Sequence, residues 1–132
     1  MRARTIAAIL ALTVAPSALA QTATPMTPAQ AVAAAQSGDV EGTFEFVVAS
    51  TGAGGFSAYL NSAADYRDPG NLTVVLDTNG RNALKEKLGG HAEDMLKGKR
   101  IRVKGIARRV PVGSHFQTRI AVDSVDQIEI LG

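Results

Sequence analysis

The feature that most constrains the fold is a period-two alternation of apolar and polar residues. It is clearest from residue 40 to residue 48, where Phe44, Phe46 and Val48 alternate with polar residues such as Glu45. Such a period is typical of a strand with one buried face. Gly42, inside this stretch, predicts a bulge or a tight bend. The same pattern predicts further strands at residues 56–61, 72–76, about 99–110 and 115–122, and a short last strand at Ile128 and Ile130.

The apolar faces of these strands predict the core. Phe56, Ala58 and Leu60 form the inner set of the second strand, and Phe116, Ile120 and Val122 form that of the fifth. The Gly-rich residues 51–55 predict a flexible turn between the first two strands. The segments 68–71 (Asp-Pro-Gly-Asn) and 111–114 (Pro-Val-Gly-Ser) predict the later turns.

Two segments have a helical pattern. Residues 80–97 place Leu84, Leu88, Met95 and Leu96 on one stripe, and Gly89-Gly90 predicts a kink between two helical pieces. Thr27-Pro28 is typical of a helix start and Gly38 of a helix stop, so residues 21–38 are interpreted as a short helix or a linker, of which residues 21–27 are expected to be mobile.

The N-terminus is typical of an export signal. Arg2 and Arg4 precede an apolar run at residues 6–14, and Ala18-Leu19-Ala20 forms a cleavage site before Gln21. We therefore expect a signal peptide at 1–20, a linker or helix at 21–38, one domain at 39–132, and a periplasmic or secreted location. The run is too short to span a bilayer. No second long apolar run follows, so no stable membrane insertion is expected.

The charged residues are segregated along the chain. Without Arg2 and Arg4, 12 basic side chains remain against 12 acidic ones. Eight basic residues and no acidic one lie from Lys97 to Arg119, namely Lys97, Lys99, Arg100, Arg102, Lys104, Arg108, Arg109 and Arg119. This basic stretch is interpreted either as a groove for a polyanion or as a solvated strand face.

Three strands, a helix and a hairpin follow in that order, and the first strand is long with an interior glycine. The stretches Leu60-Asn61-Ser62, Asp65 to Pro69, Asn71 to Val75 and Leu96 to Lys99 are similar to those of small exported bacterial OB-fold proteins. The resemblance implies an all-β, five-stranded Greek-key barrel with a helix between strands 3 and 4, which binds oligonucleotides or oligosaccharides.

The resemblance also implies a ligand face on strands two and three. Carried onto this chain, that face comprises Ser57, Tyr59, Asn61, Thr73 and Val75, with flanking loops at 51–55 and 111–114. Combined with the basic stretch, the candidate ligand-binding residues are Tyr59, Asn61, Tyr66, Arg67, Thr73, Arg102, Arg108, Arg109 and Arg119. Bases of single strands stack on aromatic residues, and Tyr59 is the one aromatic residue on this face, with Tyr66 nearby.

Other chemistries lack a matching pattern. His91 and His115 lie on different predicted elements without a third ligand, so no metal site is expected. The polar cluster at Asn61 and 65–68 is interpreted as a turn held by side chains, with a ligand or cation site as the alternative. No catalytic constellation and no cofactor motif appear.

The sequence thus predicts a non-enzymatic binding module for an anionic or extended polar ligand, such as single-stranded nucleic acid. The alternative is an envelope protein–protein interaction module. The oligomeric state stays open.

Overall fold

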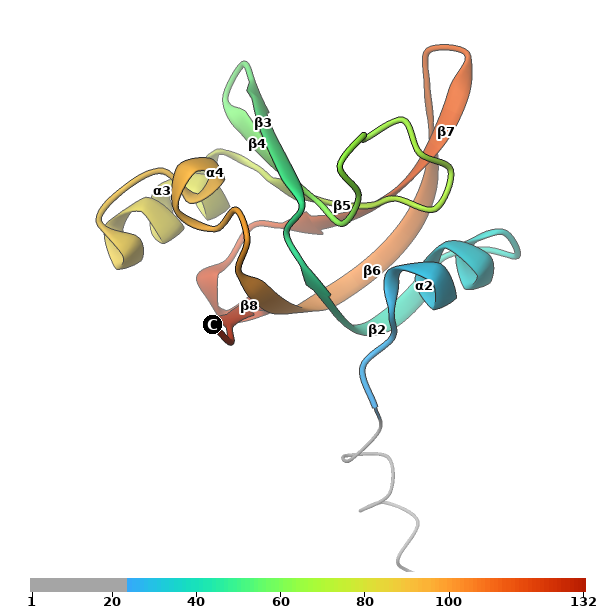
Figure 1. Ribbon diagram of the computed structural model, residues 1–132, viewed down its shortest axis with the longest axis horizontal. Helices are drawn as coiled ribbons and strands as arrows, with labels where there is room; N and C mark the ends of the chain where they lie inside the picture. Colours follow the sequence, from blue (N-terminus) through green and yellow to red (C-terminus); the bar gives the residue numbers. More distant parts are fainter. Residues whose placement is uncertain (1–23) are drawn as a thin grey trace, which may run out of the picture.

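The computed structural model describes residues 24–132 (Figure 1). The expected signal peptide at 1–20 lies outside the described residues. The strands are β2 (Val40–Val47), β3 (Ser50–Gly54), β4 (Ser57–Asn61), β5 (Leu72–Leu76), β6 (Arg100–Val112), β7 (His115–Val122) and β8 (Ile128–Ile130). The helices are α2 (Pro28–Ala35), α3 (Thr78–Leu88), α4 (Ala92–Met95) and the 3-10 helix η2 (Val125–Gln127). The chain is therefore mostly β, as predicted.

The strands form one open, seven-stranded sheet in the order β2-β6-β7-β5-β4-β3, with β8 paired to β6. The pair β5–β7 is parallel and the other pairs are antiparallel. The prediction of a closed, five-stranded barrel is therefore wrong in its strand count and in its closure.

The chain continues past the first predicted strand into β3, which was not predicted, and it changes its pairing partner at Val48-Ala49. The Val48 amide donates to the Lys99 carbonyl at 2.9 Å, whereas the Ala49 amide donates to the Asn61 carbonyl at 2.8 Å. The two segments on either side of this dipeptide, β2 and β3, consequently lie at opposite ends of the strand order.

Residues 51–54 of the Gly-rich segment 51–55 belong to strand β3 and not to a flexible turn. Gly52 pairs with Tyr59 and Gly54 with Ser57, so pairing with β4 imposes the extended backbone. The turn shrinks to Gly55-Phe56, where Gly55 has a φ of 61°. Phe56 is consequently 79% exposed and does not join the core.

Four further expectations differ from the structure. Gly42 marks no bulge, since β2 pairs with β6 in an unbroken register that sets it opposite Gly105. Phe116 lies 51% exposed near the β6–β7 turn, beyond the core, and Met95 is 44% exposed on α4. Strand β6 continues through Pro111-Val112, so its turn is confined to Gly113-Ser114.

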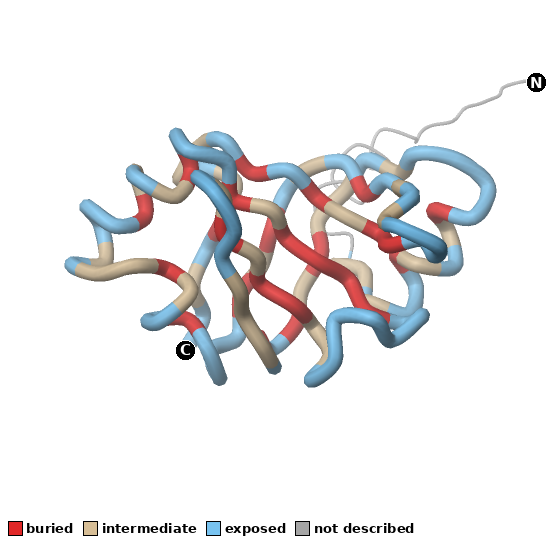
Figure 2. The backbone as a smooth tube through the Cα atoms, turned by 90° about the horizontal axis from the view of Figure 1, so that it is seen from above, coloured by how far each residue is buried: buried red, intermediate tan, exposed pale blue. Residues whose placement is uncertain are grey.

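The core lies between the curled sheet and the helices, and Figure 2 shows buried segments running along the middle of the strands. Its largest fully buried side chains are Phe44, Leu60, Leu72, Leu76, Leu84, Leu96, Ile101, Ile120, Val48, Val74, Val103 and Val122. Burial of this apolar surface is the main favourable term in folding. No described helix is both long and apolar enough to cross a membrane.

The helices lie at opposite ends of the molecule (Figure 1). Helix α2 begins with a capping box in which the Thr27 hydroxyl accepts from the Gln30 amide, and it buries Ala31 and Ala35. Just before it, Met26 bridges to Phe44 of β2, so this part of the expected mobile segment is tied to the sheet.

Helices α3 and α4 follow β5. Asp77 caps α3 by accepting from the Gly80 amide, and Gly89 ends α3 with a left-handed φ of 79°, which produces the predicted kink. A Cβ atom on Gly80 would lie 2.4 Å from the Val122 carbonyl oxygen, so the close approach of α3 to β7 requires glycine here.

Candidate ligand-binding face

Strand register places residues from five strands in one row on the sheet. Ser50 lies opposite Asn61, Asn61 opposite Thr73, Thr73 opposite Arg119, and Arg119 opposite Arg108. Residues opposite each other on paired strands share a face. The row therefore brings four predicted ligand-binding residues together: Asn61, Thr73, Arg108 and Arg119.

A neighbouring row on the same face contains Tyr59. Tyr59 lies opposite Gly52 on one side and Val75 on the other, and Val75 lies opposite Ala121. Gly52 has no side chain to cover the Tyr59 ring, and Tyr59 is partly exposed. The Arg119 guanidinium carbon lies 5.7 Å from the centre of this ring, within the range of a cation–π contact.

A polar network fixes the loop 62–71 against this face. The side-chain nitrogen of Asn71, Nδ2, donates to Thr73 Oγ1 at 2.8 Å, and Thr73 Oγ1 donates to Asn61 Oδ1 at 2.8 Å. Asn71 Oδ1 accepts from the Ala63 amide at 2.9 Å. These three side chains are almost fully buried, at 5% exposure or less. Asn61 and Thr73 thus use their polar groups within the protein and form a floor under the loop.

Gln117 also holds the loop, although it was not among the predicted site residues. Its Nε2 donates to the Tyr66 carbonyl at 3.3 Å, and its Oε1 accepts from Arg119 Nε at 2.9 Å. One side chain thereby positions the loop and the guanidinium together. The available signal was its spacing two residues before Arg119, which puts both on one face of β7.

The loop, the β3–β4 hairpin and the end of the β6–β7 hairpin enclose a hollow of about 350 Å³, here called the first hollow. It is lined by Thr51, Gly52, Ala53, Tyr59, Asn61, Tyr66, Thr73, Val112, Gln117 and Arg119. Two tyrosine rings and one guanidinium line it, and none of its described lining residues is acidic. Aromatic rings and a cation are groups that bind flat, anionic ligands, so the lining of the hollow suits such a ligand.

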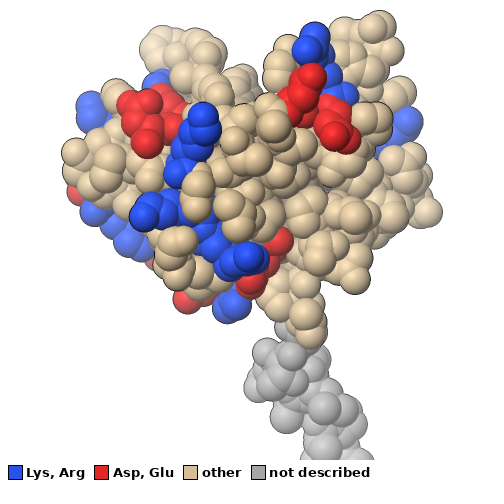
Figure 3. Space-filling view, in the orientation of Figure 1, with Lys and Arg blue, Asp and Glu red and all other residues tan. Residues whose placement is uncertain are grey.

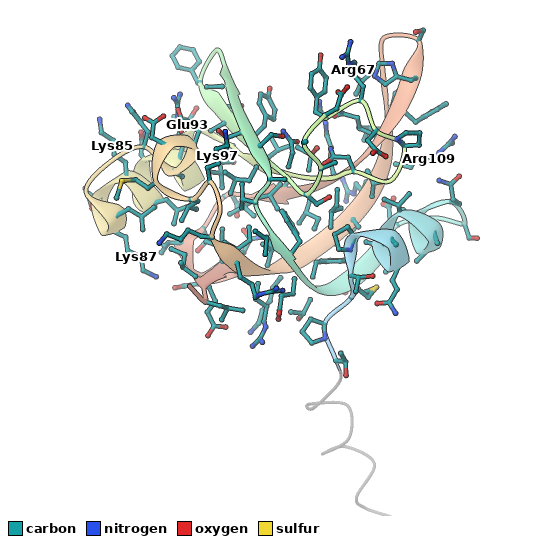
Figure 4. All side chains as sticks on the ribbon, viewed as in Figure 1. Arg67, Lys85, Lys87, Glu93, Lys97 and Arg109 are labelled. Atoms are coloured by element: carbon teal, nitrogen blue, oxygen red, sulfur yellow. The ribbon has the colours of Figure 1, made fainter. Side chains whose placement is uncertain are left out.

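A second hollow, of about 260 Å³, lies between the loop, α2 and the β6–β7 hairpin. It contains two predicted residues, Arg67 and Arg109, both labelled in Figure 4. The Arg109 guanidinium carbon lies 3.7 Å from the centre of the Phe116 ring. The remaining lining residues are Val32, Gln36, Pro69, His115, Phe116, Gln117 and Thr118.

Arg67 is paired locally with Asp65. Its Nε and Nη2 donate to the two Asp65 oxygens, each at 3.1 Å. The side-chain hydrogen bond from Arg67, aided by the one from its backbone amide, holds the pKa of Asp65 below its usual value. Asp65 also accepts from the Arg67 amide at 2.9 Å and Asp68 from the Gly70 amide at 2.8 Å, as in side-chain-held turns.

The basic stretch does not form a single face. Glu45 accepts from Arg100 at 3.4 Å and from Arg102 at 3.0 Å, and Asp39 lies 3.2 Å from Arg108. Figure 3 shows basic and acidic side chains interleaved on the face in view. Arg102 lies near the start of β6, lines neither hollow, and contacts carboxylates.

A half-buried ion pair lies at the opposite end, where Arg81 of α3 donates to Glu93 of α4. Burial acts to raise the pKa of Glu93, but the hydrogen bond and charge of Arg81 outweigh it, so the pKa lies below its usual value. Among residues 24–132, no three His, Cys, Asp or Glu side chains lie close enough together to share a metal ion.

Comparison with known proteins gives a fold but no family. No family model and no curated protein matches this sequence. The aspartyl-tRNA synthetase from Entamoeba histolytica matches 81% of the chain with a TM-score of 0.50 and 14% identity. A protein assigned as an aspartyl-tRNA synthetase from Leishmania major Friedlin matches 83% with a TM-score of 0.50 and 16% identity. The chain spans about a fifth of each of these proteins, 21% in both cases, and the likeness shows the fold alone.

Proposed function

We propose that this chain is an OB-like, non-enzymatic module that binds single-stranded nucleic acid on the face around the first hollow. The observation that carries the proposal is the arrangement of Tyr59, Tyr66 and Arg119 around one hollow without an acidic lining residue among those described. Stacking on aromatic rings and contact with a cation are the two interactions that hold single strands without sequence preference.

Two further observations support this reading. The solved structures with a similar fold carry the name of enzymes that act on a nucleic acid, tRNA. In addition, Gln117 and the Asn71 network hold the loop and Arg119 before any ligand arrives. A site fixed in advance loses less conformational entropy on binding. We further propose that the module acts after export, in the periplasm or outside the cell.

The test is fluorescence anisotropy of the purified protein with a labelled oligo-dT, at roughly 50 and 200 mM salt. We expect binding at low salt that weakens at high salt. Arg119→Ala is expected to weaken binding by about tenfold, since it removes a charged contact, and Tyr59→Ala by a similar factor, since it removes a stacking platform.

The matched control is Arg102→Ala, which removes the same charge from a residue already paired with Glu45. We expect this variant to bind like the parent protein. Equal losses for Arg119→Ala and Arg102→Ala would contradict a localised site. Absence of binding at low salt would contradict the proposal altogether, and retention of envelope proteins in a pull-down would then favour the protein-interaction alternative.

A further inference from the structure

We propose that the second hollow is a phosphate subsite for the same single strand, which crosses the loop 62–71 from one hollow to the other. This inference rests on the proposed function and adds a path and a minimum ligand length to it. This hollow lies outside the ligand face expected on β4 and β5, because α2 and the β6–β7 hairpin build part of it.

The two hollows lie on either side of one short segment of the loop. Tyr66 lines the first hollow and Arg67, the next residue, lines the second. Gln117 lines both, and its side chain donates to the Tyr66 carbonyl between them. A ligand that leaves the first hollow over the exposed Tyr66 ring therefore reaches the second hollow directly.

Arg109 is the residue best suited to receive a phosphate there. Its guanidinium lies on the Phe116 ring at 3.7 Å and makes no ion pair with any described residue. A guanidinium stacked on a ring keeps its N–H groups directed outward in its own plane, which suits bidentate contact with phosphate oxygens.

The surroundings reinforce this preference for an anion. Arg67 and His115 are the other titratable residues that line the hollow, and none of its described lining residues is acidic. Asp65 and Arg67 pair through two hydrogen bonds and offset each other's charge, so Arg109 supplies the positive charge of the hollow that no described carboxylate pairs. The apolar lining from Val32, Pro69 and Phe116 lowers the local polarity, which strengthens a charge–charge contact.

A strand is the better occupant than an isolated small anion, because the two hollows share Gln117 as a lining residue and lie on either side of Tyr66-Arg67. OB-fold proteins cover about 4–16 nucleotides per domain. A short oligonucleotide can fill the first hollow alone, whereas a longer one can also reach Arg109. The ratio of the two affinities therefore measures the second hollow separately from the first.

The experiment compares oligo-dT of about 4 and about 12 nucleotides, chosen from that range, by anisotropy at low salt. For the parent protein we expect tighter binding of the longer ligand. Arg109→Ala is expected to lower the long-to-short affinity ratio by about tenfold, the loss typical of a charge-assisted contact. For the long ligand, the slope of the logarithm of the binding constant against the logarithm of the salt concentration should also become shallower by about 0.7. This is the value for one phosphate contact on a single strand. Arg109→Lys keeps the charge but lacks the planar group that stacks on the ring. Its long-to-short affinity ratio should lie between those of the parent and Arg109→Ala.

Two variants separate the possible failures. Arg119→Ala should weaken both lengths and leave the ratio close to that of the parent, since it acts in the first hollow. Arg100→Ala removes an exposed arginine from the far end of β6 and should change neither length. A long-to-short ratio that is the same in Arg109→Ala and in the parent would overturn the second subsite while leaving the first intact. No binding of either length by the parent would overturn the proposed function itself.

Discussion

The two ends of β6 carry arginines in similar number but in different surroundings. At the Arg100 end, Glu45 contacts Arg100 and Arg102, and Glu129 lies 3.7 Å from Arg102. At the other end, Arg108 lies 3.2 Å from Asp39, but its neighbour Arg109 lies on an aromatic ring and Arg119, across on β7, lies near another. The paired arginines neutralise carboxylates of the sheet, whereas the stacked ones keep their charge for a ligand. Charge counted along the chain therefore does not tell which arginines can bind an anion.

The largest expected effect concerns the loop that separates the two hollows. Asn71→Ala removes the side chain that bonds Thr73 and Ala63 and leaves buried polar groups unsatisfied. We expect a loss of about 2–4 kcal/mol in the free energy of unfolding, together with weaker oligonucleotide binding. Urea denaturation and anisotropy measure both. Asn82→Ala, at an exposed position on α3, is the control, and an equal loss there would argue against the network.

The next effect belongs to the helical end. Arg81→Ala leaves Glu93 half-buried without its cation. We expect a loss of about 1–3 kcal/mol, below the range for a fully buried pair because both side chains keep some contact with water. Oligonucleotide affinity should stay unchanged, since this pair lies away from both hollows. If the folded Arg81→Ala variant bound the oligonucleotide more weakly than the parent protein, the proposal that the two ends act independently would be contradicted.

The same pair gives the helical end a dependence on pH. Because the pKa of Glu93 is lowered in the folded state, its ionised form stabilises the fold above the ordinary carboxyl pKa of about 4.3. That contribution is lost as the pH falls through the lowered folded pKa. Thermal unfolding of the parent and of Glu93→Gln, from pH 7 to pH 3, should show a difference in Tm that narrows in acid. A difference that is constant with pH would contradict the role of the charge.

The smallest effect is a direct attempt to make the two ends alike. Glu45→Gln removes the carboxylate between Arg100 and Arg102 while keeping the length of the side chain. We expect less than about 1 kcal/mol of lost stability, as for exposed pairs, and elution from heparin at a slightly higher salt concentration. Elution at the parent's salt concentration would mean that pairing is not what keeps these arginines from binding anions.

Local patterns were sufficient for the uninterrupted elements. His115–Val122 was predicted with its observed bounds, since alternation continues without a break and a turn precedes it. The change of pairing partner at Val48-Ala49 was not predictable, because it depends on contacts with Lys99 and Asn61 and not on the local pattern. Likewise, the glycines at 52 and 54 favour a turn locally, and pairing with β4 overrides that preference.

The site could be predicted from the sequence to about the same extent as the fold. Alternation placed Tyr59 and Arg119 on outward faces, but only the parallel pairing of β5 with β7 brings Arg119 opposite Thr73. Arg102 was grouped with the other arginines because Glu45, which contacts it, lies 57 residues earlier in the chain. The roles of Gln117 and Asn71 were not predicted, because they depend on a loop that folds back over the sheet.

The bridge from Met26 to β2 has a consequence for the behaviour of the protein in concentrated solution. The Met26 amide donates to the Thr43 carbonyl at 2.8 Å, and the Met26 carbonyl accepts from the Glu45 amide at 3.0 Å. An uncovered edge strand offers such groups to another molecule and invites edge-to-edge aggregation. The segment ahead of α2 occupies them within the same chain, so it serves as a built-in guard against self-association, and proteolysis between Met26 and Val40 would remove that guard.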